Sequence, residues 1–185
     1  KGQDVRVLKA PCMGRCSSAP VLEIGHYHIE NASLEKVDQA IKNNRIKPDI
    51  PNYETFENYI EKGGYKKLYE IRSGEENWYE NIVKADLRGL GGAGFRTAKK
   101  WELVSKETGP RYLAVNGDEG EPGTFKDKHY LETEPHMFLE GVLMASIAVS
   151  AEKCFIYIRD EYPAILHILG KEITKLEEKK IVPIG

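Results

Sequence analysis

Hydrophobic and polar positions along the chain follow two kinds of pattern. Residues 112–115 and 154–158 are short apolar runs bounded by polar residues, which is typical of buried parallel strands. Helical spacing of apolar residues is expected in six other segments, at 55–62, 65–71, 78–83, 97–107, 134–151 and 163–175. Strands that alternate with helices indicate an α/β fold with a parallel sheet. A third strand is expected to begin at 181–184.

The first forty residues carry a different pattern. A strand is expected at 5–8, a hairpin at 21–29 with Gly25 at its turn, and a helix at 36–42 with Ser33 as its N-cap. Because so short a unit cannot bury a core alone, we expect residues 1–44 to be the C-terminal half of a larger domain. Residues 45–80 are then a linker and helical lead-in, and residues 81–185 the incomplete N-terminal part of an α/β domain.

Composition narrows the classes of function. Of 185 residues 41% are hydrophobic and 30% charged, and the net charge of -2 gives no pull toward nucleic acid or an anionic membrane. No apolar run approaches the ~20 residues of a membrane helix, and 141–151 is expected to be a buried helix. No secretory signal opens the sequence. The three cysteines are Cys12, Cys16 and Cys154, and such sparse, odd usage predicts a reducing, cytoplasmic location. Cys154, in an apolar strand, is expected to be buried and inert.

Residues 89–94 form a glycine-rich loop before a predicted helix that contains Lys100. Glycine lets backbone N–H groups approach an anion closely, a helix N-terminus adds donors, and a lysine one turn later adds an ammonium. A phosphate-bearing cofactor is the natural ligand of such a loop. Gly89, Gly91 and Gly94 satisfy the dinucleotide pattern G-x-G-x-x-G, yet a helix rather than a strand is predicted before them. The loop alone is equally consistent with a flexible turn between two helices.

Residues 116–127 form an acidic loop directly after the predicted strand 112–115. Ligands of open α/β sheets bind at the carboxyl ends of the strands. Asn116 offers both a donor and an acceptor to a flavin or ribityl edge. Glu119 and Glu121 can accept hydrogen bonds from ribose or nicotinamide groups and would repel a 2′-phosphate. The spacing of a calcium-binding loop is not met. Taken alone, this segment is also consistent with a solvated acidic turn.

Together, the two loops closely resemble the NADH-binding flavoprotein family. The similarity covers residues 87–162 and ends in Tyr-Ile-Arg-Asp-Glu-Tyr at 157–162. The family includes the 51-kDa subunit of respiratory complex I, the diaphorase subunit of NAD-reducing hydrogenases and the beta subunit of soluble NAD-dependent formate dehydrogenases. Leu90, the sequence Asn-Gly-Asp-Glu at 116–119 and the fused N-terminal remnant are most similar to the formate dehydrogenase branch.

The resemblance implies a set of site residues. The implied FMN-binding residues are Gly89, Gly91, Gly92, Ala93, Gly94, Lys100, Asn116, Asp118 and Glu119. By the same resemblance, Phe95 stacks near the nicotinamide or adenine, and Glu121 hydrogen-bonds the dinucleotide. Arg96 stands where the family usually has proline, and Ala98 where it often has glycine. Both follow the glycine-rich loop, so we expect an altered start of the helix and retained binding. No side chain is expected to act as a catalytic acid or base.

The resemblance also implies the fold and the reaction. The fold is a Rossmann-like parallel sheet that binds flavin. The reaction is hydride exchange between NAD(H) and FMN, with electrons passed to or from iron–sulfur clusters. The implied partners are a molybdenum or tungsten formate dehydrogenase alpha subunit and a small ferredoxin-like gamma subunit. The alternatives are the hydrogenase diaphorase and the complex I subunit, and, in a different class, a non-catalytic scaffold that has lost its flavin. The family's 4Fe-4S cluster is expected only beyond Gly185.

The segment from Cys12 to Cys16 resembles the second half of the motif of a thioredoxin-like 2Fe-2S ferredoxin domain. Residues 1–44 are thus expected to be a remnant of that domain. Four thiolates hold such a cluster, and this segment supplies two. Three interpretations stay open: cluster ligands, a vestigial pair, or a redox dithiol near Arg15. A zinc site that recruits His26 and His28 is a fourth.

Overall fold

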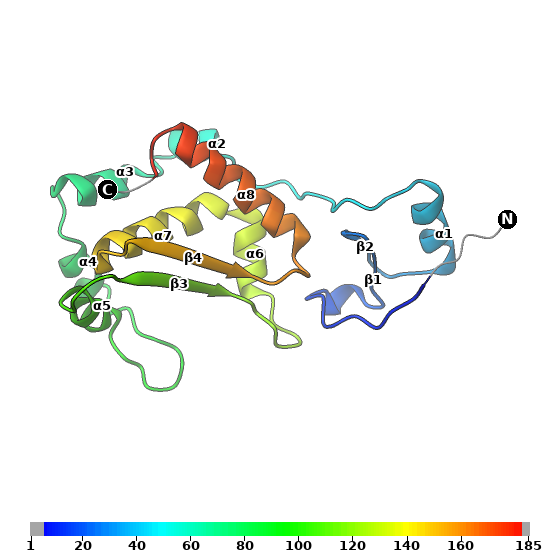
Figure 1. Cartoon of the computed structure of the whole chain (residues 1–185), viewed down its shortest axis with the longest axis horizontal. Helices are drawn as coiled ribbons and strands as arrows, with labels where there is room; N and C mark the ends of the chain where they lie inside the picture. Colours follow the sequence, from blue (N-terminus) through cyan, green and yellow to red (C-terminus); the bar gives the residue numbers. More distant parts are fainter. Residues whose placement is uncertain (1–5, 183–185) are drawn as a thin grey trace.

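The structure of the chain, a computed structural model, describes residues 6–182 (Figure 1). Its N-terminal unit contains the 3-10 turn η1 (Cys16–Ser18), strands β1 (Leu22–Ile24) and β2 (Tyr27–Ile29), and helix α1 (Leu34–Lys42). The strands pair antiparallel, and the Ser33 side chain accepts a hydrogen bond from the N–H of Lys36. The predicted hairpin and helix are confirmed. Residues 6–8 lie outside any strand, contrary to prediction, and Val5 lies outside the described residues.

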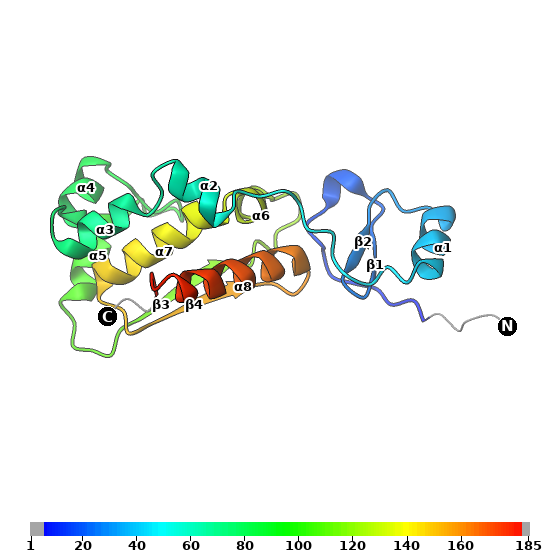
Figure 2. The same ribbon diagram turned by 90° about the horizontal axis from the view of Figure 1, so that it is seen from above.

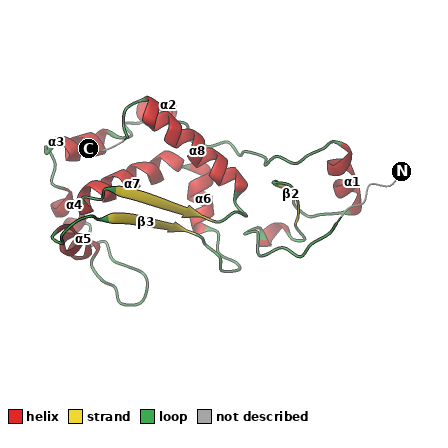
Figure 3. Cartoon of the chain, in the orientation of Figure 1, coloured by secondary structure: helices red, strands yellow, loops and turns green. Residues whose placement is uncertain are grey.

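A second, larger unit follows an extended linker, as the top view shows (Figure 2). Its elements are α2 (Phe56–Glu61), α3 (Lys66–Ser73), α4 (Trp78–Lys84), α5 (Thr97–Ser105), β3 (Tyr112–Gly117), α6 (Lys126–Thr133), α7 (Pro135–Val149), β4 (Lys153–Ile158) and α8 (Pro163–Glu178). Figure 3 distinguishes the helices from the strands. All six predicted helices and both predicted strands are present, with small differences at their ends. None of the described helices is long and apolar enough to cross a membrane.

Strands β3 and β4 pair in parallel, and α6 and α7 form the crossover between them. Helix α7 packs against both strands and against α8, so one face of the sheet is covered. On the other face Tyr112, Phe155 and Tyr157 are each more than half exposed. The expectation that both strands are buried is therefore wrong for the described residues, since their helices lie on one face only.

Two further expectations are corrected. Cys154, the second residue of β4, is exposed, contrary to expectation. Burial of the thiol group is partial, and it raises the pKa of Cys154. Ile181 and Val182 do not begin a strand: their N–H groups donate to the carbonyl of Leu176 and close the end of α8. Residues 183–185 lie outside the described part of the chain.

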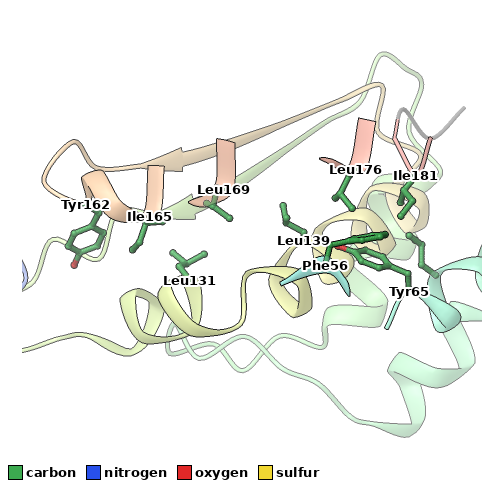
Figure 4. Close-up of a cluster of buried hydrophobic side chains, with 10 residues drawn as sticks. Phe56, Tyr65, Leu131, Leu139, Tyr162, Ile165, Leu169, Leu176 and Ile181 are labelled. Carbon is green, nitrogen blue, oxygen red and sulfur yellow. The ribbon is translucent and has the colours of Figure 1, made fainter. Parts of the chain in front are cut away.

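The hydrophobic core lies between α7, α8 and the helical lead-in (Figure 4). Tyr65 and Ile165 are completely buried at its centre. The cluster of buried side chains consists of Phe56, Tyr65, Leu68, Leu131, Leu139, Tyr162, Ile165, Leu169, Leu176 and Ile181. Residues 56–68 contribute to the same core as the sheet's helices, so the lead-in is an integral part of the α/β unit.

Buried polar groups fix the lead-in against this core. The His136 ring hydrogen-bonds Tyr65 Oη at 2.8 Å through Nδ1 and Glu172 Oε2 at 2.9 Å through Nε2. Tyr53 Oη donates to Glu172 Oε1 at 2.7 Å. The Glu140 carboxylate accepts from the backbone N–H of Tyr65 at 3.1 Å. Burial lowers the pKa of His136 despite the neighbouring carboxylate of Glu172. These hydrogen bonds join segments that are far apart in the sequence.

Candidate functional site

The glycine-rich loop lies between α4 and α5 and is fastened at its base. Arg88 and Arg96 form an isolated antiparallel bridge, and the N–H of Gly89 donates to the carbonyl of Phe95 at 2.9 Å. Beyond this base the loop extends away from the body of the molecule (Figure 1). Leu90 is 100% exposed and Phe95 is 51% exposed. Gly89, Gly91, Gly92 and Ala93 are also exposed, and Gly94 is half-buried.

Glycine occupies different positions of this loop for two different structural reasons. Gly92 and Gly94 adopt φ of +93° and +59°, a region that favours glycine. Gly91 has no such conformation, and a Cβ atom there would meet no atom within 4 Å. The described fold therefore gives no reason for glycine at 91. Close approach of a ligand to the backbone is a physical reason that remains.

Helix α5 starts at the end of this loop and carries Lys100 in its first turns. The neighbouring Lys99 ammonium lies 3.1 Å from a Glu102 carboxylate oxygen. Among residues 6–182 no carboxylate lies within 4 Å of the Lys100 ammonium. Lys100 thus presents an exposed, uncompensated positive charge on the helix that follows the loop. Arg96, before α5, has φ of -66°, a value that proline also adopts, so the backbone at this position is compatible with either residue.

The acidic loop begins at the carboxyl end of β3. Asn116 is exposed, and its Oδ1 accepts from the N–H of Asp118 at 3.0 Å. The Glu119 side chain is only 1% exposed, and its two carboxylate oxygens accept from the N–H groups of Asp127 at 2.9 Å and Lys128 at 2.8 Å. Glu119 therefore caps α6. The sequence predicts a contact between Glu119 and a flavin. Because the Glu119 carboxylate is occupied by the N–H groups of α6, only the backbone of Glu119 is available for that contact.

The two loops lie near opposite ends of β3. In Figure 1 both extend below the strand, the glycine-rich loop beside α5 near its start and the acidic loop after its carboxyl end. No hydrogen bond or ion pair joins 89–95 to 116–123 within the part of the chain that the structure describes. Asn116, Asp118 and Glu119 are adjacent at the end of β3, and exposed Glu121 follows them. Both the glycine-rich backbone and the tip of the acidic turn are accessible to solvent.

Comparison with models of protein families identifies the family of this chain. Residues 82–184 match the model described as the Nuo51 FMN-binding domain. The chain belongs to the Nuo51 FMN-binding domain family. Both candidate loops lie inside the matched range, and the N-terminal unit lies outside it.

The sequence is also similar to curated proteins. The chain is 42% identical over 130 residues to the F subunit of the NADH-quinone oxidoreductase of Aquifex aeolicus (strain VF5), covering 70% of this chain and 30% of the relative. It is 39% identical over 141 residues to the F 2 subunit of the same kind of enzyme in Rhizobium meliloti (strain 1021), covering 74% and 33%. The chain thus spans about a third of the length of these members of the Nuo51 family.

Solved structures of an NAD+-reducing NiFe-hydrogenase share the fold. The air-oxidized form superposes with a TM-score of 0.70 over 91% of this chain and 33% of that chain, at 24% identity. The H2-reduced form gives a TM-score of 0.68 at 25% identity, covering 89% and 32%. The first likeness speaks for fold alone. The predicted α/β, Rossmann-like architecture of this Nuo51-family chain is confirmed.

The cysteine pair lies in the N-terminal unit, before the matched Nuo51 range. Cys12 is half-buried and Cys16 is exposed at the start of η1. His28 Nδ1 accepts from Arg15 Nε at 2.8 Å, and burial and Arg15 together lower the pKa of His28 to about 4. Among residues 6–182 no three His, Cys, Asp or Glu side chains are arranged to hold a metal ion. The zinc alternative therefore has no support in the geometry of the described residues.

Arg159 lies behind the acidic loop, and reasoning from the sequence did not single it out. Its guanidinium is almost buried and contacts both the cysteine segment and the acidic loop. A signal was present, because a lone arginine directly follows the apolar run 154–158, inside the Tyr-Ile-Arg-Asp-Glu-Tyr segment that marked the Nuo51-type resemblance. What the sequence could not supply was its partner Cys12, which lies 147 positions away.

Proposed function

We propose that this chain forms the FMN-binding part of a subunit that transfers electrons between NAD(H) and an acceptor. The observation that carries this proposal is an exposed glycine-rich backbone followed by a helix on which the exposed Lys100 has no carboxylate partner among the described residues. A phosphate fits these residues, because Gly91 leaves room where a side chain would stand and Lys100 supplies opposite charge. When bound, FMN supplies hydride exchange with NAD(H) and single-electron transfer to a further carrier.

Each loop has a distinct part in this proposal. Gly91, Gly92, Ala93 and Gly94 present backbone N–H groups to the FMN phosphate, and Gly89, whose own N–H donates to the Phe95 carbonyl, lines the base of the phosphate site. Lys100 pairs with that phosphate. Asn116 and Asp118, with the backbone of Glu119, hold the flavin and its ribityl chain. Phe95 stacks on the NAD(H) ring system, and the exposed Glu121 carboxylate accepts hydrogen bonds from the dinucleotide. The chain's own groups bind and orient, and none is assigned a proton transfer.

The experiment uses the full-length protein purified with its partner subunits. Replacing Lys100 with Ala removes the free ammonium, and we expect the affinity for FMN to fall about tenfold, the effect of a lost charge-assisted hydrogen bond of ~1.4 kcal/mol. Lys99→Ala is the matched control, because Lys99 is one position away and already paired with Glu102. Flavin absorbance after gel filtration reports retention of FMN.

The same measurement tests the alternative of a non-catalytic scaffold. If the unmodified full-length protein carries no flavin and binds none when FMN is added, the scaffold is correct and the proposed electron transfer is wrong. If FMN binds and NADH bleaches its absorbance, the scaffold is excluded. Equal retention in the Lys100→Ala and Lys99→Ala proteins would contradict the assignment of the phosphate to Lys100 but not the presence of FMN.

For the parent enzyme we propose an NAD-dependent formate dehydrogenase, of which this would be the beta subunit. Leu90 and Gly117 support this branch, and Leu90, fully exposed, is free to contact a ligand or partner. The partners would be a molybdenum or tungsten alpha subunit and a small gamma subunit in the cytoplasm. The relatives named above support the alternatives, a complex I or hydrogenase subunit. Identification of the catalytic subunit that co-purifies distinguishes the three.

We propose further that residues 1–44 are the remnant of a thioredoxin-like ferredoxin domain, with residues 45–80 as linker and lead-in. Cys12 and Cys16 would be ligands of a 2Fe-2S cluster, and two more thiolates would have to come from elsewhere. A 4Fe-4S cluster is expected only outside this sequence. Replacing both cysteines with Ser in the full-length protein is expected to remove one 2Fe-2S signal from its electron paramagnetic resonance spectrum. An unchanged spectrum would leave the pair as a vestige.

A further inference from the structure

Three separate segments meet at the guanidinium of Arg159. Nε donates to Glu161 Oε2 at 3.0 Å, Nη1 donates to the carbonyl of Glu119 at 3.4 Å, and Nη2 donates to the carbonyl of Cys12. Arg159 is 8% exposed. A planar fork of donors can serve three acceptors in fixed directions, which a lysine ammonium on a flexible stem cannot do. The side chain therefore joins the turn after β4, the acidic loop and the cysteine segment.

On the side of the acidic loop, Arg159 holds a backbone conformation that is costly by itself. Glu119 has φ of +43°, in the left-handed region that non-glycine residues rarely adopt. Its carbonyl is fixed by Arg159, and its carboxylate is fixed by the first N–H groups of α6. Losing one of these two supports would let the backbone relax, and the residues that face the proposed nucleotide would shift with it.

On the other side, the cysteine segment is seated closely on the same unit. Gly14 has φ of +63°, and a Cβ atom there would lie 2.5 Å from Tyr162 Oη. The guanidinium of Arg159 lies 5.4 Å from the centre of the same Tyr162 ring. Arg15 Nη2 lies 3.9 Å from a Glu132 carboxylate oxygen of α6. Together with the hydrogen bond from Arg159 to the Cys12 carbonyl, the contacts of Gly14 and Arg15 fasten residues 12–16 to the turn and helix that flank the acidic loop.

We propose that Arg159 is a positioning residue that couples the Cys12–Cys16 segment to the acidic loop, so that displacement of the segment weakens binding of NADH. The proposal rests on the proposed function, in which the acidic loop faces the dinucleotide. It assigns to the N-terminal unit a part in shaping the nucleotide site.

The experiment measures NADH oxidation by the full-length protein in its native complex. Arg159→Lys loses the planar fork, and Gly14→Ala pushes the cysteine segment off Tyr162. We expect each to raise the KM for NADH roughly three- to tenfold with kcat per bound flavin unchanged, because only binding is altered. Because both changes are expected to act by displacing the same cysteine segment from the acidic loop, the double variant is expected to show no more than the larger single effect.

Gly63→Ala is the matched control for Gly14→Ala. Gly63 also has positive φ, +90°, but a Cβ atom there meets nothing within 4 Å. Alanine at position 63 also carries the cost of a positive φ, but without a clash, and we expect the KM for NADH of this variant to be unchanged. Additive effects of Arg159→Lys and Gly14→Ala, or a normal KM in either, would overturn the coupling.

A second measurement separates this proposal from the proposed function. Backbone hydrogen exchange at 117–123 is expected to accelerate severalfold in Gly14→Ala and not in Gly63→Ala, whether or not a nucleotide is bound. Unchanged exchange at 117–123 in Gly14→Ala overturns the coupling. If the unmodified protein binds neither FMN nor NADH, the proposed function is wrong, while the exchange result still decides whether the two segments are coupled.

Discussion

At the scale of single residues, some side chains have structural roles that their local sequence does not predict. Glu119 lies in the most acidic part of the chain, where a solvated or ligand-facing carboxylate is expected. The structure instead turns it inward as the cap of α6. His28, considered from the sequence only as a possible zinc ligand, has a side chain that is 6% exposed and receives a hydrogen bond from Arg15. Both cases show local patterning overridden by a partner from another segment.

Removing the Glu119 cap has a local and measurable consequence. Glu119→Ala leaves the N–H groups of Asp127 and Lys128 without their acceptor, and we expect the free energy of local opening of the first turn of α6 to fall by about 1–2 kcal/mol. Hydrogen exchange at these two amides measures this change directly. Glu119→Gln is the control, because an amide oxygen can still accept one of the two hydrogen bonds. Protection equal to that of the unmodified protein in both variants would refute the cap.

His28 gives the fold a dependence on acid pH. Its pKa is lowered from 6.5 to about 4, mainly by burial and then by Arg15 and Lys128, while Glu30 opposes the change. The unfolded chain therefore takes up the proton first as the pH falls. Stability from neutral His28 is complete above pH 6.5 and is lost between there and about 4, by roughly 3 kcal/mol in total.

An NMR titration of the His28 ring tests this expectation, with a midpoint well below 5. In His28→Gln, whose amide oxygen can still accept from Arg15, the corresponding part of the acid sensitivity is expected to disappear. A His28 midpoint at or above 6.5 would show that the ring is not buried as described.

At the scale of elements, most helices and strands followed from local spacing. Thr55, Ser33 and Pro135 mark helix starts by chemistry that acts over three or four residues, so the sequence alone placed α1, α2 and α7. The exposure of the strands did not follow, because it depends on which faces other elements cover. The buried pairing of His136 with Glu172 was likewise hidden, since its members lie 36 positions apart on different helices. Both candidate loops were predicted, whereas Arg159 was not.

Helix α3 depends on a cap that comes from another helix. The Glu140 carboxylate of α7 accepts from the N–H groups of Tyr65 and Leu68 and from Tyr59 Oη. Burial and this carboxylate raise the pKa of Tyr59, which keeps its hydroxyl protonated as a donor. Glu140→Leu would leave these buried donors without an acceptor, and we expect it to cost at least ~3 kcal/mol of unfolding free energy.

Glu140→Gln keeps an acceptor of the same shape and is expected to cost about 1 kcal/mol. Urea denaturation of the two variants provides the comparison. Equal losses in Glu140→Gln and Glu140→Leu would show that the hydrogen bonds contribute little and that packing dominates.

At the scale of the whole molecule, the described residues form a sheet that is covered on one face. Tyr112, Phe155 and Tyr157 form an apolar surface on the other face, and the rings of Tyr112 and Phe155 lie 6.2 Å apart. An exposed apolar sheet face favours self-association. We expect the 185-residue chain, expressed by itself, to self-associate and to bind a hydrophobic dye through this surface.

Changing these three residues to Thr, which suits a strand and is polar, is expected to lower dye binding severalfold and to shift the chain toward monomer in analytical ultracentrifugation. Circular dichroism is expected to stay unchanged. Tyr130→Thr, at a half-exposed position away from the sheet, serves as control. If the triple variant self-associates as strongly as the unmodified chain, another surface is responsible for the association.

The antiparallel bridge between Arg88 and Arg96 has a consequence for the rate of cofactor binding. The bridge fixes the base of the glycine-rich loop while its tip is exposed to solvent. We therefore expect an anionic nucleotide to bind without a prior conformational change of this loop. Uptake of cofactor is then paced by diffusive encounter and by attraction to Lys100, and we expect its rate to decline as ionic strength rises.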